Sequence, residues 1–200
     1  KLLLATSGGI DSMILLHLFQ QLEFDIALAH CNFQLRGMDS FTDQNFVQEY
    51  ADANNIPIFV TQFDTQAFAK DYKLSTQVAA RELRYNWFYE LLETENYDYI
   101  LTAHHADDNL ETFLINLSRG TGLEGLTGIP QQNENIIRPL LLFSREEIEA
   151  YAKENNILWR EDSSNASDKY LRNKIRHHLV PILKEINPHF LSSFHKTQTH

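Results

Sequence analysis

The sequence predicts an α/β fold in which a mostly parallel five-stranded sheet is flanked by helices and followed by a helical C-terminal extension. Short apolar segments alternate with helical segments of 12 to 20 residues, which is typical of βαβ units. Polar stretches directly follow several of the strands, as in parallel sheets that bind ligands at their carboxyl ends. Hydrophobic residues make up 43% of the 200 and charged residues 22%, a globular composition.

Strands are expected where short apolar runs are bounded by turn residues. The first run leads directly into a glycine-containing loop, and Pro57 is compatible with the third strand because it lies near its start. The five predicted strands are 1–5, 24–30, 56–63, 97–103 and 136–142.

Helices are expected where apolar residues recur at helical spacing, as Met13, Leu16 and Phe19 do. Ser75 is a plausible N-cap, and Ser144 begins a sequence resembling a capping box. The predicted helices are 11–22, 39–54, 75–95, 105–118 and 144–155. The pattern from 159 onward is helical with breaks at two prolines, so we divide the chain into an α/β domain, 1–158, and a helical extension, 159–200.

Composition excludes several classes of protein. The single cysteine, Cys31, rules out an intrachain disulfide framework or a cysteine-based zinc cluster, and no apolar run approaches the roughly 18 residues of a spanning helix. We therefore expect a cytoplasmic protein without a membrane partner. The net charge of −10 argues against a nucleic-acid-coating protein. Residues 159–200 carry seven Lys/Arg against four Asp/Glu, which suits either phosphate contacts or an ordinary helical surface.

The loop after the first strand has the features of an anion site. Its two glycines allow a tight turn, and the following helix presents free N–H groups and a positive dipole end. The two serines add hydroxyl donors, the aspartate is suited to a metal ion that bridges phosphates, and the lysine of a Walker loop is absent. A plain strand-to-helix turn with a polar cap is the alternative. The loop consists of Ser7, Gly8, Gly9, Ile10, Asp11 and Ser12.

A second polar cluster follows the fourth strand, with His104, His105, Asp107, Asp108 and Glu111 in eight residues. The spacing of His104, Asp108 and Glu111 predicts that they share one helical face. Acids early in a helix are ordinary, and zinc is a rival reading that lacks the HExxH pattern. We favour carboxylates that bind an amine or magnesium, with His104 moving a proton.

Other segments are more ambiguous. Residues 120–125 read GxGxxG but follow a helix, so we expect a flexible loop rather than a dinucleotide site. Arg84 is suited to binding a phosphate or a carboxylate. The alternative is that it forms a solvent-exposed ion pair on the helix surface. Arg176 shares a helical face with Arg172 and is suited to the same anions. His30 is placed to stack near an adenine, although a lone histidine there is more often structural.

The SGGIDS loop resembles the SGGxDS signature of the PP-loop ATP pyrophosphatases. Further stretches are similar to one family in that group, the tRNA(Ile)-lysidine synthetases, although Phe33 and Gln34 replace a His and a Gly common there. The family's C-terminal tRNA-binding modules lack counterparts here, so the chain resembles the catalytic half. The matching stretches are 30–36, 80–85, 104–112, 119–129, 138–140, 161–165 and 172–176.

The resemblance implies that ATP adenylates the C2 oxygen of the wobble cytidine in an isoleucine tRNA, and that free L-lysine then displaces AMP. It implies that the SGGIDS loop binds pyrophosphate with Mg²⁺ near Asp11. Asp108 and Glu111 would bind or orient lysine, His104 and Arg84 would assist at the nucleotide, and Arg176 would steady the substrate. The alternatives are a thiolating or amidating PP-loop enzyme and a non-catalytic nucleotide- or tRNA-binding module, and a homodimer is left open.

Overall fold

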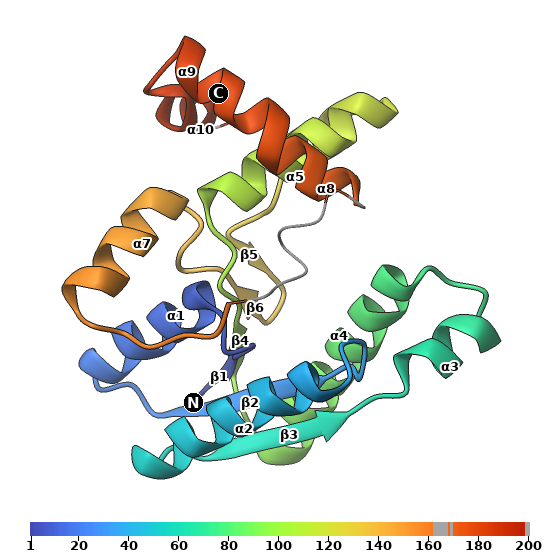
Figure 1. Cartoon of the computed structure of the whole chain (residues 1–200), viewed down its shortest axis with the longest axis vertical. Coiled ribbons are helices and arrows are strands. Elements are labelled where there is room, and N and C mark those ends of the chain that lie inside the picture. The colour runs from blue at the N-terminus through green and yellow to red at the C-terminus, as the bar shows by residue number, and fades with distance from the viewer. Residues whose placement is uncertain (162–167, 169, 199–200) are drawn as a thin grey trace.

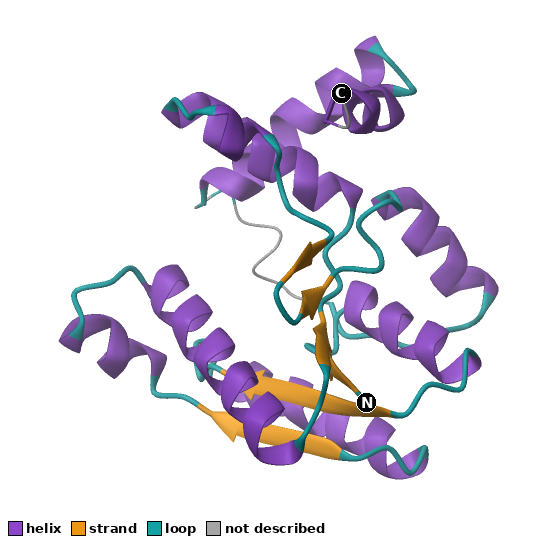
Figure 2. Ribbon diagram, turned by 180° about the vertical axis from the view of Figure 1, so that it is seen from behind, coloured by secondary structure: helices purple, strands orange, loops and turns teal. Residues whose placement is uncertain are grey.

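The structure is a computed structural model that describes residues 1–161, 168 and 170–198. Its sheet has the order β3-β2-β1-β4-β6-β5 and carries helices on both faces (Figures 1 and 2). All neighbouring strands are parallel except β5, which is antiparallel to β6. The predicted α/β class is confirmed. The strands are β1 (Leu2–Ala5), β2 (Ile26–Asn32), β3 (Ile58–Gln62), β4 (Tyr99–Leu101), β5 (Gln132–Asn133) and β6 (Ile136–Ile137).

The sheet has six strands rather than the predicted five. Only two residues of the apolar run 136–142 pair with β4, and β5 is the added strand that pairs with them. The backbone N–H of Arg138 donates instead to the carbonyl of Gln131 at 2.9 Å, and Pro139 has no N–H to continue a ladder. The unpredicted helix α3 (Thr65–Asp71) begins where Asp64 Oδ1 accepts from the N–H of Ala67.

The remaining predicted helices are present, with ends that differ by a few residues. Ser75 caps one of them by accepting from the N–H of Val78 at 3.3 Å, and Ser144 forms the expected capping box with Glu147. These helices are α1 (Ile10–Gln21), α2 (Met38–Ala53), α4 (Thr76–Glu95), α5 (Ala106–Arg119) and α7 (Arg145–Glu154).

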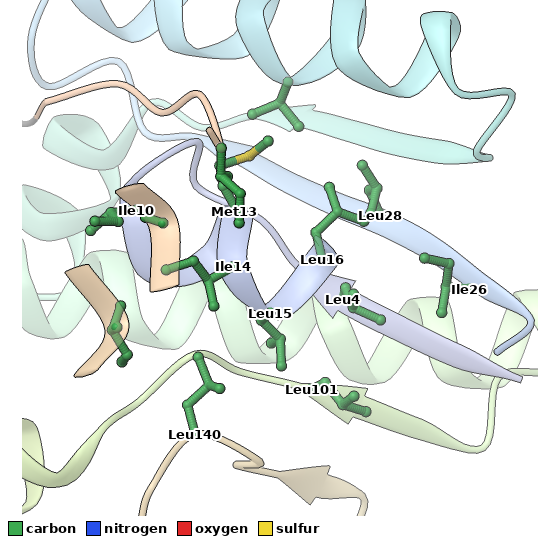
Figure 3. Packing of buried hydrophobic residues seen from close by; sticks show 14 of the residues in the cluster. Leu4, Ile10, Met13, Ile14, Leu15, Leu16, Ile26, Leu28, Leu101 and Leu140 are labelled. Carbon is green, nitrogen blue, oxygen red and sulfur yellow. The ribbon is translucent and has the colours of Figure 1, made fainter. Parts of the chain in front are cut away.

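Alternating side chains of the buried strands build a core on each face of the sheet. Leu4 and Leu28 face α1, α2 and α7, and Figure 3 shows Met13 and Leu16 of α1 packed over them. The adjacent Leu3 faces the opposite side and packs against α4. Because the central strand β1 is covered on both faces, its sequence is a continuous apolar run.

The C-terminal extension is helical, as predicted, and it packs against α5 (Figure 1). Leu110 of α5 forms a third buried cluster with Ile175, Val180 and Phe194 of the extension. The division at residue 158 remains a prediction. The extension consists of α8 (Leu171–Lys174), the π-helix η2 (Ile175–Leu179), α9 (Val180–Ile186) and α10 (Phe190–Gln198).

The order of strands positions the site. From β1 the chain proceeds outward through β2 and β3, and then returns to place β4 on the other side of β1. The connections that leave β1 and β4 therefore run in opposite directions. Open parallel sheets bind ligands in the crevice between two such connections. No helix in the described part of the chain has both the length and the apolar character needed to cross a membrane.

Candidate active site

A cleft of about 330 Å³ opens beyond the carboxyl ends of β1 and β4. The structure therefore brings together the glycine-containing loop, the polar cluster after β4 and one arginine of α4, as the sequence predicts for a shared edge of the sheet. The predicted site residues that line the cleft are Ser7, Asp11, Ser12, Arg84, His104 and Asp108.

The loop is held in shape by Ser12, whose side chain is buried within it. Ser12 Oγ accepts from the backbone N–H groups of Ser7 and Gly8, both at 3.2 Å, and donates to the carbonyl of Gly9 at 2.9 Å. Gly9 is the N-cap of α1 and provides no side-chain cap. The N–H groups of the first turn of α1 therefore remain available at the positive end of the helix dipole, which suits a polyphosphate.

Gly8 gives the loop a conformation that other residues rarely adopt. Its φ is +89°, and an added Cβ would lie 3.2 Å from Cγ2 of Val47. Gly8→Ala is expected to lower the free energy of unfolding by about 1–2 kcal/mol, as measured by denaturant titration. Gly9→Ala is the matched control, because Gly9 has a φ of −75° and only an ordinary 3.5 Å contact with Ser7 Oγ. Equal losses for both variants would contradict this account of the turn.

Two residues that the sequence analysis did not single out support the loop. The backbone N–H of Arg160 donates to the carbonyl of Gly8 at 2.9 Å, and Arg160 Nε donates to Oδ1 of Asp43 at 3.1 Å. Asp43 is buried and also contacts the guanidinium of Arg36. A buried carboxylate between two guanidinium groups thus ties the loop to α2 and to the segment after α7.

His30 supports the loop rather than facing the cleft. Its Nδ1 lies 2.9 Å from the carbonyl oxygen of Thr6, and the side chain is buried. Burial lowers the pKa of His30, so the ring is neutral and donates from Nδ1. The expected stacking position near an adenine is therefore not where this side chain lies. Phe33 lines the cleft instead, with the guanidinium of Arg84 5.1 Å from the centre of its ring.

Asp11 faces basic side chains from two other segments. Arg145 Nη1 at the start of α7 donates to both carboxylate oxygens, at 2.8 and 3.0 Å, and His105 Nε2 lies 3.8 Å from Oδ1. Burial raises the pKa of Asp11, although His105 and Arg145 lower it.

The carboxylates of the cleft fit a Mg²⁺ ion whose coordination shell is completed by oxygens of the substrate. Asp11 and Asp108 line the same cleft, and carboxylate oxygens are ligands that Mg²⁺ prefers. Among the described residues no three His, Cys, Asp or Glu side chains are arranged to hold a metal ion by themselves. Mg²⁺ is commonly bound in this way, by one or two carboxylates of the protein together with substrate phosphates and water.

The helix after β4 begins one residue later than the spacing of the polar cluster implies. His105 is its N-cap and forms a capping box with Asp108, whose Oδ2 accepts from the N–H of His105 at 3.1 Å. His104 consequently lies outside the helix, with Nδ1 2.9 Å from Thr102 Oγ1. The prediction that His104, Asp108 and Glu111 share one helical face was wrong, although His104 and Asp108 still meet in the cleft.

Arg176 joins the two acids of α5. Its Nε donates to Oε1 of Glu111 at 2.6 Å, and Nη2 donates to Oε2 of Glu111 at 3.0 Å and to Oδ1 of Asp108 at 3.2 Å. Glu111 is only 1% exposed and is not among the residues that line the cleft. Burial raises the pKa of Glu111, with Arg176 opposing the rise. Arg176 lies in the π-helix η2, a distortion that often occurs at functional sites.

The electrostatic environments of His104 and Asp108 differ. Burial would raise the pKa of Asp108, but His105, His104 and a backbone N–H lower it overall. Burial lowers the pKa of His104 to about 4. At neutral pH the site therefore holds a carboxylate beside a neutral imidazole.

The pKa of His104 predicts an acid sensitivity of folding. An unfolded histidine has a pKa near 6.5, so the unfolded chain binds a proton before the folded one does, and stability falls as pH decreases from 6.5 toward 4. Between pH 7 and pH 5 the wild type should lose about 2 kcal/mol more of its free energy of unfolding than His104→Gln. Urea titrations at both pH values measure this difference. Parallel losses in the two proteins would contradict a neutral, buried His104.

A second cavity of about 260 Å³ adjoins the cleft and shares His104 and Arg172 with it. Arg81 and Arg138 also line it. Within the described residues the buried Nε of Arg138 has no hydrogen-bond partner. Three guanidinium groups, one with a free buried donor, suit a carboxylate or phosphate.

The GxGxxG sequence does not form a dinucleotide turn. It follows α5 rather than a strand, and it includes only the short helix α6 (Leu123–Leu126). Its end is tied to α5, because Asn116 Nδ2 donates to the carbonyl of Gly125 at 2.9 Å. Most of the polar run 161–165 lies outside the described residues.

A model of the PP-loop domain family matches residues 1–183. The chain is 44% identical over 197 residues to the tRNA(Ile)-lysidine synthase of Porphyromonas gingivalis, covering 98% of this chain and 43% of that protein. It is 46% identical over 193 residues to the tRNA(Ile)-lysidine synthase of Chlorobaculum tepidum, covering 94% of this chain and 58% of that protein. The chain thus spans about half the length of these relatives.

The fold is similar to that of a U34-tRNA thiolase from Methanococcus maripaludis that has a [4Fe-4S] cluster, with a TM-score of 0.78 and 13% identity. That match covers 100% of this chain and 72% of the thiolase. The likeness supports the arrangement of sheet and helices described above.

Proposed function

Since this chain belongs to the PP-loop domain family, we propose that it catalyses the ATP-dependent attachment of lysine to the wobble cytidine of an isoleucine tRNA. In the first step the C2 oxygen of cytidine attacks the α-phosphorus of ATP, and pyrophosphate leaves. In the second step the ε-amine of lysine attacks C2, the C2–oxygen bond breaks, AMP leaves with that oxygen, and the amine loses a proton. These are reactions of the cytoplasm, where tRNA and free lysine are available.

The cleft supplies groups for the first step. The backbone donors around Ser7 to Ser12 and the dipole of α1 would bind the departing pyrophosphate. Asp11 would hold Mg²⁺, which when bound neutralises charge on the phosphates. Arg84 and Phe33 also line the cleft and would contact the nucleotide.

The second step requires a neutral lysine amine. The ammonium has an ordinary pKa of about 10.4, so it must lose a proton before attack. Asp108 would bind and orient the ammonium group beside the neutral imidazole of His104. The proton would pass to water, because a pKa of about 4 makes His104 too weak a base to hold it at neutral pH. Glu111 would act by holding Arg176 against Asp108. The arginines of the second cavity, Arg138 among them, would bind the carboxylate of lysine.

The observation that carries the proposal is that one cleft joins the SGGIDS loop to His104 and Asp108, in a chain 44% identical to a lysidine synthase over almost its whole length. Thiolation is less well supported. Cys31 is the only cysteine in the sequence, and burial raises its pKa to about 12, so it stays a protonated thiol and cannot by itself hold a cysteine-ligated cluster.

The test is to incubate the full-length protein with ATP, Mg²⁺, lysine and an isoleucine-tRNA transcript. Pyrophosphate release and the mass of the wobble nucleoside are then measured. We expect pyrophosphate release that requires the tRNA, and lysidine only when lysine is present. A non-catalytic binding module would release no pyrophosphate, and a thiolase would not respond to lysine. Either result would contradict the proposal.

A further inference from the structure

Arg145 occupies the carboxylate that the proposed reaction assigns to Mg²⁺. Its Nη1 bonds both oxygens of Asp11, and the two side chains are about one-third exposed, at 35% and 30%. Asp11 lines the cleft and Arg145 contacts it from outside the lining residues, so the pair is partly exposed to solvent and able to rearrange. In this arrangement a divalent cation that approached Asp11 would meet a guanidinium on the same two oxygens.

The base of Arg145 is fixed while its Nη end carries the contact. The backbone N–H of Arg145 donates to Oδ2 of Asp107 at 2.8 Å, and its Nε donates to Oε1 of Glu149 at 2.8 Å. These two bonds involve neither Asp11 nor the loop. Because the guanidinium is rigid and planar, a change of side-chain rotamer would release Nη1 from Asp11 and Nε from Glu149 together. The backbone bond to Asp107 would remain, so α7, which packs on α1 in the same core, would stay docked.

The position of Arg145 favours phosphate as the second partner of its guanidinium. Asp11 lies in the first turn of α1, where the loop donors and the helix dipole point to the phosphates. A guanidinium is suited to phosphate oxygens because it presents several donors in a planar fork. A cation that binds Asp11 would also repel Arg145 and so favour its move to a nearby anion.

We propose that Arg145 is a phosphate-binding residue that exchanges Asp11 for the polyphosphate of ATP when nucleotide and metal bind. This inference rests on the proposed function, since it assigns a further residue to the same nucleotide site. It accounts for the pairing of a partly exposed carboxylate of the metal-binding type with a guanidinium. It also predicts two opposite effects of Arg145. The side chain competes with a metal ion that binds without nucleotide, and it stabilises the complex in which metal and nucleotide bind together.

The two effects make the test specific. In the full-length protein, Arg145→Gln should bind Mn²⁺ alone about threefold to fivefold more tightly than the wild type, because Asp11 is released from a partly exposed ion pair. The same variant should bind the α,β-methylene analogue of ATP in the presence of Mg²⁺ about tenfold more weakly, because a charged donor to phosphate is lost. Electron paramagnetic resonance measures Mn²⁺ binding, and calorimetry measures the analogue.

The matched control is Arg119→Gln, which removes an exposed arginine at the end of α5 and should leave both affinities unchanged. Weaker binding of both ligands to Arg145→Gln would indicate a structural role and overturn the inference. Unchanged analogue binding would also overturn it. If Arg145→Gln fails to fold, Arg145→Lys serves instead, with smaller changes of the same opposite signs expected. A wild type that binds no analogue would reject the proposed function together with this inference.

Discussion

Replacing Asp11 with asparagine is expected to slow AMP transfer by about a hundredfold to a thousandfold. The carboxylate lies at the start of α1 within the cleft, where it would hold the cation that neutralises the departing pyrophosphate. Asparagine keeps the size and one acceptor oxygen but loses the charge. Single-turnover release of pyrophosphate, with tRNA and saturating Mg²⁺, measures the step directly.

The control for this substitution is Asp25→Asn, which removes an exposed carboxylate before β2 and should release pyrophosphate at the wild-type rate. Asp11→Asn should also fold with nearly normal stability, because its main ion pair with Arg145 is partly exposed and such pairs contribute roughly 0–1 kcal/mol. A variant that folds and keeps a rate within a few-fold of the wild type would remove Asp11 from the mechanism.

Asp108→Asn is expected to separate the two steps of the reaction. The amide can still accept the capping hydrogen bond from the N–H of His105, so α5 should form normally. The charge that would bind the lysine ammonium is lost, and a charged hydrogen bond of this kind contributes about 1.5–3 kcal/mol. Lysidine formation should therefore fall about tenfold to a hundredfold at subsaturating lysine, while AMP transfer stays within about threefold of the wild type.

The measurement compares pyrophosphate release with the mass of the wobble nucleoside at several lysine concentrations. The effect should appear mainly in the KM for lysine, and Asp25→Asn again serves as the control. A loss confined to pyrophosphate release, with lysine dependence unchanged, would instead assign Asp108 to the nucleotide and metal.

The parts of the site that are local in sequence were predictable. The strand, two glycines and helix around Ser7 to Ser12 predict an anion site because all its donors come from one short segment. The polar cluster after β4 was predicted to meet this loop because parallel strands end at one edge. The position of His104 could not be predicted, because histidine is not a favoured N-cap and the capping role of His105 shifts the start of the helix.

The missed residues make contacts across long stretches of chain. Arg145 bonds a carboxylate 134 residues away, and Arg160 bonds one 117 residues away. The local pattern around Arg145 indicates only a capping box, which the structure confirms. Nothing in that pattern specifies that α7 packs on α1 with the arginine over the loop. In the sheet, Pro139 was the available signal that the strand beginning at residue 136 ends early.

The central claim is that the loop after β1 positions ATP so that AMP is transferred to the C2 oxygen of cytidine. The most direct measurement uses an isoleucine-tRNA transcript with oxygen-18 at that oxygen, together with ATP, Mg²⁺, lysine and the full-length protein. Mass spectrometry of the released AMP should find the label, because the C2–oxygen bond breaks when lysine enters. Unlabelled AMP formed alongside lysidine would contradict the account, since activation would then have occurred on another group.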